Sequence, residues 1–164
     1  MLGLSKRTDY ALLALSYLAR AEGGRAVRAR EIAEEHDIPV ELLSKILQKL
    51  ARAGMLASAP GPTGGYVMAR IPDEISVGSV IAAVEGGAPA LVACMKGDDH
   101  GCEQHTKCTI RRPLASVNAR VHHLLDHITL SEINGQPSPP ADASPKRATI
   151  GASALRLPSR DGVA

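Results

Sequence analysis

The sequence predicts a mainly α-helical fold, namely a winged helix-turn-helix with a long C-terminal dimerisation helix and a disordered tail. Residues 28–54 hold two short amphipathic segments separated by a tight break, which is typical of a helix-turn-helix. Two short apolar segments joined by glycines and prolines follow at residues 55–69, as in a β-hairpin. Residues 110–128 repeat apolar side chains at heptad spacing, which predicts one long helix. The tail, residues 134–164, is rich in proline, serine and alanine and is not expected to build a core.

The composition limits the class of protein. At 164 residues and 45% hydrophobic content, the chain predicts one globular domain with appendages. It contains no run of about 18 apolar residues, and its first residues do not read as a secretory signal, so neither a membrane span nor export is expected. Its cysteine count of three is odd, which favours a reducing cytoplasm over a disulfide framework.

Residues 5–20 are expected to form the first helix. Ser5 is a suitable N-cap, and Asp9 lies in the first turn, where the helix dipole favours a carboxylate. That dipole effect is by itself enough to account for an aspartate at this position. The expected buried face follows helical spacing and comprises Tyr10, Leu13, Ala14, Tyr17 and Leu18. The turn Glu22-Gly23-Gly24 ends the helix.

The helix-turn-helix pattern follows. Its first helix is expected from Arg28 to His36, and Asp37 at the break tolerates a left-handed backbone. Pro39 opens the second helix and Gly54 is its expected C-terminal cap. The expected buried stripe of the second helix comprises Leu42, Leu43, Ile46, Leu47 and Leu50. The alternative interpretation is an ordinary αα-hairpin within a helical domain.

A wing is predicted directly after the second helix. Met55–Ser58 and Tyr66–Ala69 read as two strands, and the segment Ala59–Gly65 between them consists of turn formers. A glycine-rich tip allows the backbone to approach a phosphate or to enter a narrow minor groove. Two helices followed by a wing are typical of DNA-binding domains, so we expect residues 1–72 to bind double-stranded DNA.

The charge distribution is compatible with this interpretation. Residues 1–70 carry ten Lys and Arg against seven Asp and Glu, whereas residues 71–134 carry five against eight. The expected DNA contacts are phosphate-binding Lys6, Arg7, Arg28 and Arg30, major-groove Ser44, Lys45 and Lys49, and wing residues Thr63 and Gly64.

A dimerisation segment is predicted after the wing. Residues 75–85 read as a helix capped by Ser76, and a longer helix begins near Pro113. The heptad seam of the longer helix comprises Ile110, Leu114, Val117, Val121, Leu124 and Ile128. A seam needs a partner helix, and DNA operators are usually palindromic, so we expect a homodimer. The alternative is a seam packed within the same chain. The nearby histidines His122, His123 and His127 are interpreted as surface or interface residues.

All three cysteines lie within one segment of fifteen residues, Cys94–Cys108. Thiols are soft ligands that suit iron–sulfur clusters, zinc or copper(I). Three thiols on a loop rich in glycine and aspartate can converge on one point, so residues 73–133 are expected to hold a metal centre beside the dimerisation helix. The alternative is three unrelated thiols on a mobile loop.

The chain resembles the Rrf2 family of bacterial transcription regulators. The resemblance covers about residues 1–133 and depends on the opening Leu4–Ala11, the wing sequence Gly61–Tyr66, the three cysteines and the closing Ile128–Ile133. It implies a homodimer that binds a double-stranded DNA operator and carries an iron–sulfur cluster, either [2Fe-2S] or [4Fe-4S]. Carried over by position, the thiolate ligands would be Cys94, Cys102 and Cys108.

The chain departs from the family pattern at three places. The cysteine gaps of seven and five residues resemble iron-responsive and Suf-associated members rather than the cluster-assembly regulator. Arg111 occupies the position of that regulator's histidine ligand, whereas Asp9 matches the aspartate ligand of nitric-oxide-sensing members and is the candidate fourth ligand. His100 and His105 are the alternatives for that role. Pro60 replaces the arginine that some members insert into the minor groove, which favours backbone contacts from the wing.

We therefore expect a cytoplasmic repressor whose operator affinity is set by an iron–sulfur cluster that senses iron, redox or nitric oxide status. One alternative is a winged-helix regulator stabilised by zinc, with His100 or His105 completing a Cys₃His site. Another is a metal-free thiol switch or partner-binding adaptor, in which Lys96 or Lys107 activates a cysteine. An enzyme is not expected, because the sequence offers neither a nucleophile–base pair nor a phosphate-binding glycine loop.

Overall fold

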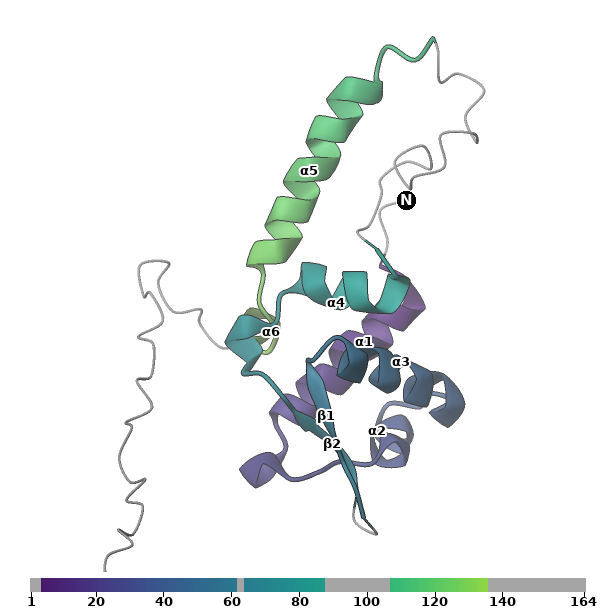
Figure 1. The fold of residues 1–164 in the computed structure, drawn as a ribbon, viewed down its shortest axis with the longest axis vertical. Coiled ribbons are helices and arrows are strands. Elements are labelled where there is room, and N and C mark those ends of the chain that lie inside the picture. Colours follow the sequence, from purple (N-terminus) through teal and green to yellow (C-terminus); the bar gives the residue numbers. More distant parts are fainter. Residues whose placement is uncertain (1–3, 62–63, 88–106, 136–164) are drawn as a thin grey trace, which may run out of the picture.

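A computed structural model of the chain describes residues 4–61, 64–87 and 107–135. Residues 136–164 of the predicted disordered tail and two of the three cysteines lie outside these residues. The described part is mainly helical with one two-stranded sheet, which confirms the predicted winged helix-turn-helix (Figure 1). Its elements in chain order are α1 (Lys6–Ala19), η1 (Glu22–Gly24), α2 (Ala29–Glu35), α3 (Val40–Arg52), β1 (Leu56–Ala59), β2 (Gly65–Met68), η2 (Pro72–Glu74), α4 (Val77–Glu85), α5 (Arg111–His127) and α6 (Leu130–Ile133).

Helix α1 begins where predicted but buries a different face. The Ser5 side chain accepts a hydrogen bond of 3.2 Å from the Thr8 backbone N–H and so caps the helix. The buried residues are Thr8, Ala11, Ala14, Leu15 and Leu18. The predicted Leu13 is 41% exposed and is therefore wrong as a core residue. Apolar side chains occupy more than one face of this helix, so spacing alone did not single out the face that packs against α3 and α4.

The helix-turn-helix forms as predicted. Asp37 has a positive φ of 52° between α2 and α3, and Pro39 is the N-cap of α3. Gly54 follows the C-cap of α3 with φ 72°, the left-handed conformation that ends helices. Four residues of the predicted α3 stripe are buried, namely Leu43, Ile46, Leu47 and Leu50. They pack into a core shared by α1, α2, α4 and the base of the wing.

The wing contains a third extended segment that the sequence did not indicate. Strands β1 and β2 pair antiparallel, with Leu56 opposite Met68. Val27, in the connection between η1 and α2, pairs with Tyr66 through two backbone hydrogen bonds of 2.9 and 2.8 Å. A Cβ at Gly65 would lie 2.4 Å from the Val27 carbonyl oxygen, so this close approach requires glycine. The wing is therefore fixed at its base to the segment that leads into α2.

Helix α4 is capped by Gly86, which has a left-handed φ of 81°.

Helix α5 extends away from the rest of the molecule, with its C-terminal end nearest to α4 and α6 (Figure 1). None of its residues is buried. Its anchorage lies at that end, where the Val77 N–H donates to the Ile128 carbonyl at 2.9 Å. Asp126 packs directly over Gly78, and a Cβ at Gly78 would lie 2.0 Å from the Asp126 carboxylate and 3.2 Å from its backbone nitrogen. The short helix α6, which was not predicted, follows with Thr129 in a complete capping box.

Candidate functional site

The exposed side of α3 is the candidate recognition surface. Lys45 is exposed near its middle and Ser44 is half-buried beside it. Lys49 lies differently from the prediction, because its ammonium group donates a hydrogen bond to the backbone carbonyl of Val84 in α4. Two of the three predicted major-groove residues thus remain available on the recognition surface, and the third is engaged within the protein.

The described residues on either side of the wing tip include two glycines, Gly61 and Gly64. Gly64 donates its N–H to the Gly61 carbonyl at 2.9 Å, and a Cβ on Gly64 would lie 2.5 Å from the Ala59 carbonyl oxygen. Pro60 and Gly61 are exposed. The predicted contact Thr63 lies outside the described residues. A tip of this kind can approach a DNA backbone closely because no side chain projects from Gly61 or Gly64.

The four predicted phosphate contacts occupy two helix N-termini. Lys6 and Arg7 are exposed in the first turn of α1. Arg28 is the N-cap of α2 and is exposed, and Arg30 in the first turn of α2 forms a 2.8 Å ion pair with Glu34. Both side chains of that pair are largely exposed, so its stabilisation is small and Arg30 can exchange Glu34 for a phosphate. Helix N-termini also favour anions through their free N–H groups.

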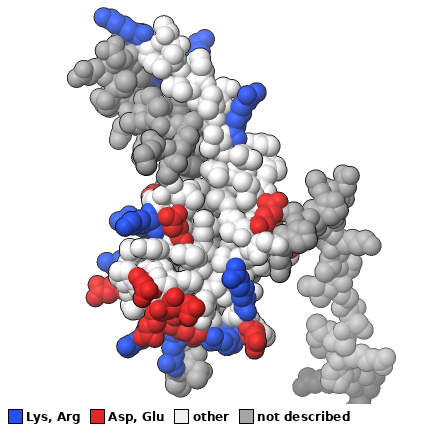
Figure 2. Space-filling view, turned by 180° about the vertical axis from the view of Figure 1, so that it is seen from behind, with Lys and Arg blue, Asp and Glu red and all other residues white. Residues whose placement is uncertain are grey.

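Figure 2 shows how charge is arranged on the side of the molecule opposite to the view of Figure 1. Carboxylates gather in one group over the lower part of the winged-helix half, and Lys and Arg side chains border them. A carboxylate group repels phosphates, so this face is not uniformly attractive to DNA. On this face the Lys and Arg side chains border the carboxylates and do not form one continuous basic surface.

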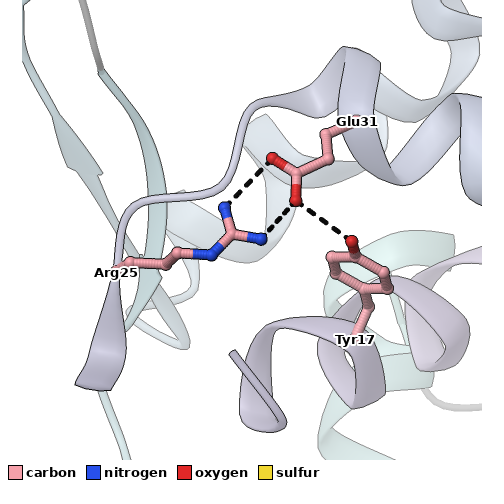
Figure 3. Close-up of polar contacts among 3 residues, drawn as sticks. All are labelled: Tyr17, Arg25 and Glu31. Carbon is pink, nitrogen blue, oxygen red and sulfur yellow. Dashed lines mark hydrogen bonds and ion pairs between the residues drawn. The ribbon is translucent and has the colours of Figure 1, made fainter. Parts of the chain in front are cut away.

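A polar network that the sequence did not indicate joins α1 to α2 (Figure 3). The Arg25 guanidinium donates to both oxygens of Glu31, at 3.1 and 2.5 Å, and the Tyr17 hydroxyl donates to the same carboxylate at 3.0 Å. The bonds from Arg25 lower the pKa of Glu31, with the Tyr17 hydroxyl adding to the effect and burial opposing it. The same hydrogen bond to Glu31 raises the pKa of Tyr17. The network fixes the connection before α2 to the body of the protein.

One of the three predicted thiolate ligands is described. Cys108 is half-buried just before α5 and has a free thiol. Cys94 and Cys102, together with the alternative ligands His100 and His105, lie outside the described residues. Asp9 is exposed in the first turn of α1. Within the part of the chain that the structure describes, no three His, Cys, Asp or Glu side chains form a metal-binding group.

The histidines of α5 lie on its surface. The rings of His123 and His127 stack with their centroids 4.1 Å apart, and His122 lies 3.2 Å from the Asn118 side chain. His123 and His127 are exposed and His122 is half-buried. This arrangement agrees with their interpretation as surface residues.

Crossing a membrane requires a helix that is both long and apolar. None of the helices that the structure describes combines this length with this apolar character.

Sequence similarity relates the chain to transcription regulators. The Rrf2 family pattern, described as an iron-dependent transcriptional regulator, matches residues 4–136. The HTH-type transcriptional regulator IscR of Aliivibrio salmonicida is 33% identical over 130 residues, which is 79% of this chain and 76% of that protein. IscR of Vibrio cholerae is 32% identical over 130 residues, covering 79% and 73%.

Solved structures show the same fold. CymR, the global cysteine regulator of B. subtilis, superposes with a TM-score of 0.63 at 26% identity, covering 82% of this chain and 98% of that chain. IscR of T. potens superposes with a TM-score of 0.60 at 27% identity, covering 80% of this chain and 85% of that chain. The chain is thus similar in sequence to the two IscR transcriptional regulators and in fold to CymR and to IscR of T. potens.

Proposed function

Because the chain belongs to the Rrf2 family of transcription regulators, we propose that it is a homodimeric repressor whose affinity for DNA is set by an iron–sulfur cluster. The chain is a DNA-binding transcriptional regulator and not an enzyme. The observation that carries the finer proposal is the set of three thiols within residues 94–108, in a chain 33% identical to an IscR. Thiolates are the usual ligands of iron–sulfur clusters.

The donor set fits such a cluster in chemistry. Cys94, Cys102 and Cys108 would hold it, with the Asp9 carboxylate as the fourth ligand. When bound, the cluster would supply sensitivity to iron supply, oxidants or nitric oxide. The protein's own part is to place Cys108 just before α5, so that the ligand segment leads directly into the proposed dimerisation helix.

The dimer is proposed from the exposed seam of α5. Ile110, Val117 and Leu124 are 58%, 47% and 60% exposed, although all three are large apolar residues. Heptad-spaced apolar side chains are stabilised when a second helix covers them. A second copy of α5 has the matching spacing and would bring two α3 helices to one operator.

For DNA recognition we propose that Ser44 and Lys45 face the major groove. The wing backbone at Thr63 and Gly64 would approach the adjacent DNA backbone. Lys6 and Arg7, together with Arg28 and Arg30, would bind phosphates.

The test is anaerobic purification followed by visible absorbance and by iron, sulfide and zinc analysis. We expect a coloured protein with iron and sulfide, and a triple Cys→Ser variant that is colourless and whose promoter occupancy no longer responds to iron starvation, air or nitric oxide. A wild-type protein that stays iron-free after anaerobic reconstitution would contradict the proposal that the chain binds an iron–sulfur cluster. Tightly bound zinc without absorbance would instead identify a zinc-stabilised regulator.

A second candidate is a metal-free thiol switch. It is favoured by the partial exposure of Cys108, because oxidation of cysteine follows access to solvent, and by the fold similarity to CymR. In this case DNA affinity would respond to a thiol oxidant in a protein that contains neither iron nor zinc, and the Cys108→Ser variant would not respond.

A further inference from the structure

The last turn of α4 makes polar contacts with two other helices through consecutive residues. The Val84 backbone carbonyl accepts a hydrogen bond from the Lys49 ammonium group of α3. The Glu85 carboxylate accepts hydrogen bonds from the hydroxyls of Ser5 and Thr8 at the start of α1, the latter at 3.3 Å. One helix end is thus connected to the recognition helix and to the helix that presents Lys6 and Arg7.

The contact of Lys49 satisfies a need of α4. The final carbonyls of a helix have no partner within the helix and carry partial negative charge, which a cation stabilises. The Ala82 carbonyl is satisfied by the N–H of Gly86, whereas the Val84 carbonyl lies beyond the reach of the helical pattern and takes its bond from α3. Lys49 is half-buried, in contrast to the exposed Lys45 one turn earlier. The Lys49 ammonium group therefore lies against the end of α4 and not on the recognition surface.

Glu85 makes the opposite kind of contact, in which a carboxylate lies at the start of a helix. The start of a helix carries partial positive charge and free N–H groups, which favour a carboxylate. Thr8 is 1% exposed, so its hydroxyl needs a partner within the protein, and it finds Ser5 and Glu85. Glu85 thereby holds the first turn of α1, which carries Lys6 and Arg7, against the end of α4.

We infer that Lys49 and Glu85 are positioning residues for DNA binding, which set the recognition helix and the basic first turn of α1 at a fixed separation by holding both to the end of α4. Lys49 on this reading does not contact DNA itself. The inference rests on the proposed use of α3 as the recognition helix. Because a duplex presents groove and phosphates at fixed spacing, a recognition helix that shifts relative to α1 loses the fit to its specific site.

The test measures the affinity for DNA as a function of salt concentration. The probes are a duplex selected from random-sequence DNA by the wild-type protein and a scrambled duplex of the same composition. Each phosphate contact contributes about 0.9 to the slope of log affinity against log salt concentration. Removing a lysine that binds a phosphate therefore lowers this slope, whereas removing a lysine that only holds a helix leaves the slope unchanged. Thermal unfolding of each variant measures its folded fraction.

The Lys49 variants separate the two roles. Lys49→Gln keeps a donor for the Val84 carbonyl without the charge, and we expect wild-type affinity and slope. Lys49→Met keeps the length without a donor, and we expect an affinity loss of about tenfold on the selected duplex, an unchanged slope and little change on the scrambled duplex. The control Lys6→Gln, at an exposed lysine proposed to bind a phosphate, should lower the slope by about 0.9.

The Glu85 variants test the second contact. Glu85→Gln keeps an acceptor oxygen for the hydroxyls of α1, so we expect it to bind the selected duplex like the wild type. Glu85→Ala removes the acceptor, and we expect a loss of several-fold on the selected duplex only. A protein that is merely less stable would lose affinity for both duplexes equally, since only its active fraction would fall.

The outcomes are distinct. A slope lowered by about 0.9 in both Lys49 variants would show a phosphate contact and overturn the assignment of Lys49. Wild-type affinity of Lys49→Met would overturn it as well, and Glu85→Ala binding as tightly as Glu85→Gln would overturn the assignment of Glu85. Failure of the wild-type protein to select any duplex would overturn the proposed function together with this inference.

Discussion

Thr8 donates a hydrogen bond of 3.3 Å from its hydroxyl to the carboxylate of Glu85, a residue 77 positions away in the chain. Thr8 is 1% exposed and Glu85 is exposed, so the bond connects the protein interior to its surface. A partner this remote in sequence leaves no periodic signal. It fixes the start of α1 to the end of α4.

Replacing this hydroxyl should reduce stability. The Thr8→Val variant keeps the shape of the side chain but has no donor, and we expect the free energy of unfolding in urea to fall by about 1 kcal/mol. The exposed residue Thr109 provides the control, because Thr109→Val should leave the unfolding midpoint unchanged. Equal midpoints for Thr8→Val and wild type would contradict the role given to this bond.

The Arg25–Glu31–Tyr17 network should make stability depend on acid pH. Hydrogen bonds from Arg25 lower the pKa of Glu31 below its usual value of 4.5, so the folded state binds the proton less tightly than the unfolded state. The stabilisation is complete above that usual value and is lost as the pH falls through the lowered pKa. Glu31→Gln should therefore be less stable than the wild type at neutral pH, by less than the effect of Thr8→Val because the pair is partly exposed.

Unfolding in urea measured across the acid range checks this expectation. The difference between wild type and Glu31→Gln should shrink as the pH falls below about 4.5. Glu34→Gln, which removes only an exposed ion pair with Arg30, is the control and should differ little from the wild type at any pH. A constant difference across the acid range would refute the assignment of the pKa shift to Glu31.

The base of the wing should not tolerate a side chain at Gly65. A Cβ there would lie 2.4 Å from the Val27 carbonyl oxygen, so Gly65→Ala must separate β2 from the Val27 segment. We expect a loss of about 1–3 kcal/mol in stability and weaker DNA binding, because such overpacking displaces backbone. Gly87→Ala is the control, since nothing lies within 4 Å of a Cβ at that position. Thermal unfolding and DNA binding of both variants would decide the point.

Charging the seam of α5 should prevent dimerisation. The double variant Val117→Glu/Leu124→Glu places two carboxylates where two apolar side chains are now exposed, and in a dimer the four carboxylates would repel one another. Sedimentation velocity should show a dimeric wild type and a monomeric variant. Ala119→Glu, exposed on the other side of the helix, should remain dimeric. A double variant that stays dimeric would place the interface elsewhere.

Asp9 should influence how long the cluster is retained. If its carboxylate is the fourth ligand, Asp9→Asn should lose visible absorbance and iron faster in air than the wild type, while Asp73→Asn, a change of another exposed aspartate, should not. The comparison is made on anaerobically reconstituted proteins with matched initial iron content. Identical rates for Asp9→Asn and the wild type would exclude this aspartate and direct attention to His100 and His105.

Local features of the fold were predictable because local chemistry determines them. The caps at Ser5 and Ser76, the positive φ at Asp37 and the glycine after α3 all follow from individual residue types. The buried face of α1 was not predictable, since several of its faces are apolar and packing against α3 and α4 selects one of them.

The long-range contacts of the candidate site could not be predicted from the sequence either. Lys49 has the spacing of a recognition residue, yet its ammonium group reaches the end of α4, 35 residues further along the chain. Val27 has no partner strand in its own neighbourhood and pairs with Tyr66 only when the wing folds back. The exposed basic residues and Cys108 were found by residue type, whereas these contacts become visible only in three dimensions.

The one-sided anchorage of α5 makes it a lever. Its 17 residues extend over about 25 Å, and the contacts of Asp126 and Ile128 with the start of α4 lie at its C-terminal end. A tilt of about 10° at that pivot would therefore carry the opposite end, next to Cys108, through about 4 Å. The same geometry applies when the movement starts at the other end of the helix. A displacement of several ångströms around Cys108 would therefore rotate the C-terminal end of α5, beside α4, through only a small angle.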